Sequence, residues 1–126
     1  MSGLPDAHES DAPMHHELRI YDIFPERREP FHARFRDHAL RMFQRHGFKP
    51  LQIWETEVGG QLRMLYLLEW PDDATREAAW KHLLADPEWI EVKRRTQAEH
   101  GELVARAEGW VLRAVDYGPR LAPAAG

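Results

Sequence analysis

The sequence predicts a single α+β domain whose strands and helices follow the order β-α-β-β-α-β. Three observations support this prediction. Four segments are rich in β-branched and aromatic residues, as strands are. Segments with apolar residues at three- and four-residue spacing separate the first strand from the second and the third from the fourth. The 126 residues, 43% of them hydrophobic and 30% charged, suffice for one globular core.

The first half of the chain predicts a strand, a helix and a β-hairpin. The first strand spans 17–24 and stops at Pro25. The helix has Pro30 in its first turn and Gly47 just after its end. Its spaced positions are Phe31, Phe35, Ala39, Met42, Phe43 and His46. The second and third strands, 51–58 and 62–70, flank the turn pair Gly59 and Gly60, so we expect them to be antiparallel neighbours.

The second half predicts two helical segments and a last strand. Asp72 is the expected N-cap of a helix with apolar positions Ala79, Trp80, Leu83 and Leu84. Asp86 and Pro87 restart a helix, because aspartate caps and proline fits the first helical position. Residues 91–108 are helix-compatible, and 109–117 read as the final strand. The whole is the ferredoxin-like plan, over 14–117, with flexible tails predicted at 1–13 and 118–126.

The third strand is apolar on both faces, which predicts a homodimer. Two helices can cover only one face of a four-stranded sheet. An uncovered face would expose a larger apolar patch than monomers usually tolerate. The residues expected in that patch are Trp54, Met64, Tyr66 and Trp70. We therefore expect two sheets to pack face to face in a dimeric α/β barrel.

Composition argues against several classes of protein. The formal net charge of −4 gives no field that would attract nucleic acid or an anionic membrane. The chain has no cysteine, hence no disulfide or thiol chemistry, and no apolar run of about 20 residues that could span a bilayer. Residues 1–13 do not resemble a signal or transit peptide. We expect a cytoplasmic protein with neither nucleic-acid nor membrane partners.

The eight histidines do not form a metal-binding pattern. His15 and His16 are neighbours on a strand and point to opposite faces, and the helical histidines lack chelating spacing. We expect no metal site and no cofactor. A metal or haem held by histidines distant in the sequence is the remaining alternative.

The candidate site is a set of polar and aromatic strand residues expected to share a cavity. Arg19 is the expected ligand for a carboxylate or enolate oxygen, because its guanidinium offers paired donors. Glu17 is a candidate base, and Tyr66 a candidate proton donor. The predicted ligand-binding residues are Arg19, Tyr21, Trp54, Thr56, Tyr66 and Trp70. The alternative is structural: Glu17 and Arg19 pair with each other and satisfy buried polar groups.

Four segments in register resemble the NIPSNAP domain family, within the dimeric α/β-barrel group of ferredoxin-like proteins. They are Glu17-Leu18-Arg19 with Tyr21, Arg45-His46-Gly47-Phe48, Trp54 with Thr56-Glu57 and Gly59, and Asp86-Pro87-Glu88-Trp89. Tyr66 stands where many relatives carry a histidine, so the resemblance does not imply histidine-dependent chemistry there.

The resemblance implies several functions. The wider group includes small monooxygenases, isomerases and haem-handling enzymes, whereas the eukaryotic NIPSNAP proteins resemble scaffolds. We expect this chain to bind a small, partly apolar or anionic ligand in the barrel cavity, and whether it also converts that ligand stays open. The alternatives are a non-catalytic protein–protein adaptor and a cofactor-independent monooxygenase or isomerase-like enzyme.

Overall fold

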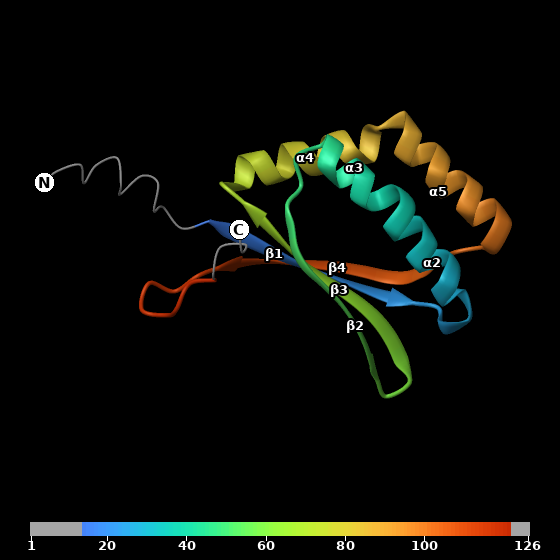
Figure 1. The fold of residues 1–126 in the computed structure, drawn as a ribbon, viewed down its shortest axis with the longest axis horizontal. Helices are drawn as coiled ribbons and strands as arrows, with labels where there is room; N and C mark the ends of the chain where they lie inside the picture. The colour runs from blue at the N-terminus through green and yellow to red at the C-terminus, as the bar shows by residue number, and fades with distance from the viewer. Residues whose placement is uncertain (1–13, 122–126) are drawn as a thin grey trace, which may run out of the picture.

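The computed structural model describes residues 14–121 as one antiparallel sheet with all helices on one face (Figure 1). The strand order is β2-β3-β1-β4. β1 (His15–Ile23) lies in the centre and pairs with β3 (Gln61–Trp70) and β4 (Val104–Arg113), while β2 (Pro50–Val58) pairs with β3. The predicted ferredoxin-like α+β fold is confirmed.

The predicted first helix is built from four consecutive pieces. A short 3₁₀ turn, η1 (Pro25–Arg27), leads into α2 (Arg28–Arg34), and α3 (Leu40–Arg45) ends the run. Between α2 and α3 lies a π-helical turn, η2 (Phe35–Ala39). Such turns are rare and often occur at functional sites. The buried residues of the run lie on one face toward the sheet: Phe31, Phe35, Ala39, Met42 and Phe43.

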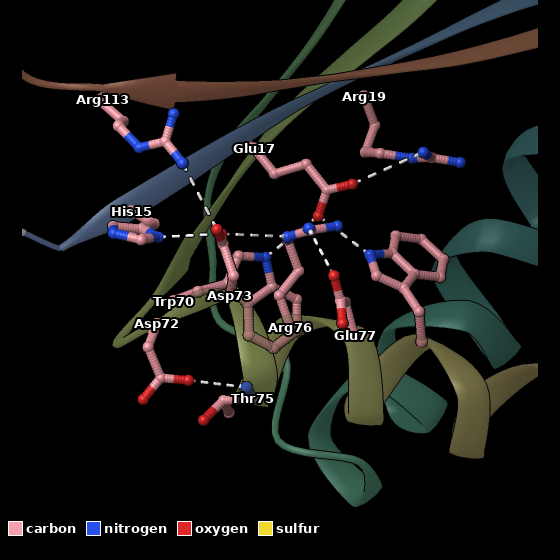
Figure 2. Close-up of polar contacts among 11 residues, drawn as sticks. His15, Glu17, Arg19, Trp70, Asp72, Asp73, Thr75, Arg76, Glu77 and Arg113 are labelled. Atoms are coloured by element: carbon pink, nitrogen blue, oxygen red, sulfur yellow. Dashed lines mark hydrogen bonds and ion pairs between the residues drawn. The ribbon is translucent and has the colours of Figure 1, made fainter.

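The helices α4 (Asp73–Ala85) and α5 (Pro87–His100) begin at the two predicted caps. Asp72 accepts a hydrogen bond from the Thr75 N–H at 2.7 Å, and Asp86 accepts one from the Glu88 N–H at 2.8 Å. These bonds satisfy amides that lack an intrahelical partner. Figure 2 shows that Asp73, beside the first cap, also contacts His15 and Arg113 from the sheet.

The last strand begins earlier than the sequence predicts. The prediction placed it at 109–117, but β4 spans Val104–Arg113. Gly101, with a φ of 80°, ends α5, and Leu103 is already buried in the core. The predicted N-terminal tail, 1–13, lies outside the described residues, and so do residues 122–126 of the predicted C-terminal tail.

The core lies between the helices and the sheet face that they cover. Every second residue of β3 is buried there: Leu62, Met64, Tyr66, Leu68 and Trp70. The prediction that Met64, Tyr66 and Trp70 belong to an uncovered face is therefore wrong. Trp54 does lie on the face without helices, because its register partner is Leu65, which points away from the helices. Trp54 is 46% exposed.

No helix of residues 14–121 lies on the second face of the sheet, which is called the open face here (Figure 1). An apolar band crosses it, because residues that are opposite one another in the register are apolar. Leu18, for example, lies opposite both Leu67 and Trp110. The band consists of Trp54, Leu65, Leu67, Leu18, Ile20, Trp110 and Leu112.

Within residues 14–121, no helix is long and apolar enough to cross a membrane.

Candidate functional site

Glu17 is a buried carboxylate on β1, under the helices, with 3% of its surface exposed. Its Oε1 accepts hydrogen bonds from the indole N–H groups of Trp70, at 3.1 Å, and Trp80, at 2.9 Å. Its Oε2 lies 3.6 Å from Nη1 of Arg19, a contact that Figure 2 shows. Buried charges require such partners, because burying an unpaired charge costs several kcal/mol. Glu17 therefore joins β1, β3 and α4 through one side chain.

Arg19 lies beside Glu17 and above an aromatic wall. Its guanidinium carbon is 4.5 Å from the Trp80 ring centre and 5.7 Å from that of Tyr21. Burial opposes its charge, but Tyr21, Tyr66 and Glu17 outweigh burial and raise the pKa of Arg19. Its register partner on β4 is Gly109, where a Cβ would collide with the Arg19 guanidinium. The missing side chain at this position therefore makes room for Arg19.

Tyr21 and Tyr66 form a pair of phenols behind Arg19. Their hydroxyl oxygens are 2.6 Å apart, and the rings meet edge to face. Tyr66 is fully buried, and burial, then the Tyr21 hydroxyl, raise the pKa of Tyr66 well above its usual value. The raised pKa keeps Tyr66 protonated, and its hydroxyl is hydrogen-bonded to that of Tyr21.

Only four of the seven predicted site residues form this polar cluster: Glu17, Arg19, Tyr21 and Tyr66. Trp70 supports it from the core, donating to Glu17 and packing against Phe48. Trp54 and Thr56 do not take part. They pair with Leu65 and Arg63 and so lie on the open face, away from the helices. The expectation that these two residues share a cavity with Tyr66 is therefore wrong.

A cavity of about 280 Å³ lies beside the cluster, between the sheet and the helices. It is more enclosed than the hollows over α2 and β2 and over the open face. Of the predicted residues, Tyr21 lines it. The other lining residues are Phe31, Arg34, Phe35, Ala39, Phe43, Leu84, Trp89, Lys93, Val104 and Ala107. The π-helical turn contributes Phe35 and Ala39, so it borders the cavity directly.

Two cations, Arg34 on α2 and Lys93 on α5, stand among the aromatic lining residues. The charged atoms of each lie 5.7 Å from the Trp89 ring centre. Arg34 donates to the Thr96 hydroxyl at 3.0 Å, and within residues 14–121 neither cation forms an ion pair. Burial lowers the pKa of Arg34, and burial together with the Arg34 charge lowers that of Lys93. The cavity therefore has a positive wall.

The sequence interpretation did not include Arg34 or Lys93. Arg34 stands among six arginines that, mixed with acids, suggest a solvated helix face. A usable signal was present: Arg34 lies between the apolar positions Phe31 and Phe35, and Lys93 follows Trp89 by one helical turn.

Among the described residues, no group of three or more histidine or acidic side chains is placed to hold a metal ion.

Glu55 on β2 forms a separate polar cluster with α2. It accepts two hydrogen bonds from Arg28, at 2.9 and 2.8 Å, and its Oε1 lies 2.6 Å from Nε2 of His32. The bonds from Arg28, then that from His32, lower the pKa of Glu55 from 4.5 to about 2. The cluster thus holds the edge strand against the helix.

Replacing Glu55 with glutamine is expected to make stability less dependent on pH in the acid range. Because folding lowers the pKa of Glu55, the carboxylate stabilises the fold above pH 4.5 and loses that effect as the pH falls toward 2. At pH 7 we expect Glu55→Gln to cost about 0.5–1 kcal/mol, because the pair is solvent-accessible. Denaturant unfolding at pH 7 and pH 2.5 measures the difference. A difference that persists at the lower pH would contradict this account.

The fold and the cavity define a ferredoxin-like α+β protein with a ligand-sized space between its sheet and its helices. The NIPSNAP family model matches residues 16–119. Since this match covers most of the sequence, the chain belongs to the NIPSNAP family, and the resemblance inferred from the sequence is confirmed. No curated protein sequence matches the chain.

Solved structures of several proteins share the fold. A NIPSNAP-like domain protein from Burkholderia xenovorans is 25% identical, with a TM-score of 0.71, and the match covers 87% of this chain and 92% of that one. A NIPSNAP family protein of unknown function from Agrobacterium tumefaciens is 16% identical, with a TM-score of 0.71 and coverage of 86% and 95%. An antibiotic biosynthesis monooxygenase is 15% identical, with a TM-score of 0.53 and coverage of 81% and 99%. The last two similarities concern the fold alone.

Proposed function

We propose that the protein is a homodimer that binds a small, partly apolar ligand in the cavity of each subunit. The single observation that supports the ligand is the partly open cavity of about 280 Å³ with its aromatic lining. This volume lies just below the usual range of small-molecule sites, so the ligand must be small. A cavity of about 150 Å³ accommodates benzene, so this one has room for a two-ring molecule.

The dimer is supported by the apolar band of the open face. Trp110 is 50% exposed and Trp54 46%, and both belong to a band that crosses all four strands. A second copy presents the same band and can cover it through a two-fold axis. A solved structure of a dimeric ferredoxin-like protein from an uncultured marine organism, 11% identical with a TM-score of 0.58, shares the fold.

The ligand site differs from the one that the sequence predicts. The cavity is lined by Tyr21, but Tyr66 and Trp70 are fully buried in the core, and Trp54 lies on the open face. Glu17 is occupied by two indole donors. We therefore assign to Glu17 and Arg19 the structural alternative, a buried pair that stabilises the fold, and place ligand binding in the adjacent cavity.

Calorimetric titration with naphthalene-2-carboxamide, a neutral two-ring probe, tests the ligand site. We expect binding to the wild type and its loss in Ala107→Phe, because Ala107 lines the cavity on β4. Ala105→Phe is the matched control, since Ala105 is an exposed residue of the same strand outside the lining. Absence of binding of both this amide and the corresponding carboxylate, or binding that Ala107→Phe leaves unchanged, would reject the site.

A further inference from the structure

Two positively charged side chains, Arg34 and Lys93, line a cavity whose other lining residues are aromatic or apolar. Arg34 and Lys93 extend from different helices toward the same indole, that of Trp89. Both are partly withdrawn from water, as the lowered pKa values of both groups indicate. Two like charges placed together in such a site destabilise one another, and an anion between them would relieve that cost.

The neighbouring groups provide little compensation for these charges. The Thr96 hydroxyl accepts one bond from Arg34, and Tyr21 and Glu102 are the groups that raise its pKa. Glu102 itself accepts a hydrogen bond from Gln97 at 3.0 Å. Other arginines of the same helical run have carboxylate partners: Arg28 pairs with Glu55, and Arg45 with Asp86 and Glu88. Within residues 14–121, no such partner pairs with Arg34 or Lys93.

We propose that the cavity selects carboxylates, with Arg34 and Lys93 binding the carboxylate group and the aromatic wall binding the apolar body of the ligand. Arginine suits this role because its planar guanidinium presents paired donors to a carboxylate. The body would lie among Tyr21, Phe31, Phe35, Phe43 and Trp89. The ligand class is thus an aromatic or similarly flat apolar carboxylic acid. This inference rests on the proposed ligand site and adds the charge of the ligand to it.

The test compares naphthalene-2-carboxylate with its neutral amide, which has the same rings and nearly the same shape. The wild type is expected to bind the carboxylate at least about tenfold more tightly, since hydrogen bonds to charged groups are stronger than neutral ones. Added salt is expected to reduce this preference. Arg34→Gln and Lys93→Gln are each expected to bring the ratio of the two affinities close to one.

The matched control is Lys81→Gln, which removes one positive charge from an exposed position of α4 outside the cavity lining. It is expected to leave the ratio unchanged. Lys93 is only half-buried, so its variant is expected to fold even if Arg34→Gln does not.

The outcomes separate the two proposals. Equal affinities for carboxylate and amide, or a preference that Lys93→Gln leaves intact, would overturn the carboxylate inference and leave the ligand site standing. Failure of both probes to bind would overturn both proposals.

Discussion

Replacing Trp110 with glutamate is expected to convert the proposed dimer to a monomer. Trp110 lies in the apolar band of the open face, opposite Leu18, and is 50% exposed in the single chain. A buried aromatic at the centre of an interface typically contributes about 2 kcal/mol or more. Because a two-fold axis places the change on both sides, the loss is about 4 kcal/mol, or roughly 1,000-fold in dissociation constant. Light scattering coupled to size-exclusion chromatography gives the mass directly.

Ile90→Glu is the matched control for Trp110→Glu. Ile90 is 49% exposed, so it is an equally accessible apolar residue, but it lies on α5, on the helical side. This variant is expected to remain dimeric. If the wild type is a monomer, the dimer proposal is wrong, and the apolar band becomes the surface of the adaptor alternative, which binds a different protein.

Replacing Glu17 with alanine is expected to destabilise the fold by about 3 kcal/mol. The change leaves the indole N–H groups of Trp70 and Trp80 without their acceptor and Arg19 without its carboxylate. Each unpaired buried donor adds a desolvation cost. For a domain of this size, the melting temperature would fall by more than 10 °C, roughly. Denaturant unfolding measures the free energy, and thermal unfolding followed by circular dichroism measures the melting temperature.

Two further variants test the reason for that loss. Glu17→Gln keeps an oxygen that accepts from the indoles but removes the charge beside Arg19, so its loss should be smaller than that of alanine. Glu57→Ala removes the same side chain from an exposed strand position and is expected to change stability by about 0.5 kcal/mol or less. A loss below about 1 kcal/mol for Glu17→Ala would contradict the structural role of this carboxylate.

Local sequence signals predicted the elements and their order well. The caps at Asp72 and Asp86 and the glycine turn at Gly59 depend on neighbouring residues, so they can be read from the sequence. The start of β4 could not be read from the sequence, because residues 91–108 are compatible with a helix throughout. Burial of Leu103 and the turn at Gly101 decide that boundary.

Assigning the faces of the sheet needed information that period-two alternation lacks. The alternation places Met64 and Tyr66 on one face of β3 and Leu65 and Leu67 on the other. Because both sets are apolar, the sequence does not show which of the two faces the helices cover. Placing Trp54 relative to Tyr66 also requires the register of β2 against β3. The site was only half predicted for the same reason. Residues within β1 could be grouped, but Arg34 and Lys93 meet only through the packing of α2 on α5.

The π-helical turn at Phe35–Ala39 keeps the apolar residues of the helical run on one face. Residues four apart in a regular α-helix advance about 40° beyond a full turn, so a long series at that spacing drifts off one face. The wider turn compensates for the drift and keeps Ala39 and Phe43 aligned with Phe31. If all the residues were kept in a regular α-helix, Phe43 would lie about 120° around the axis from Phe31, outside the cavity wall. Deleting one residue here would instead remove the wide turn and leave Phe43 only about 20° from Phe31, still in the wall. A one-residue deletion is therefore expected to be tolerated better at this turn than elsewhere in the helical run.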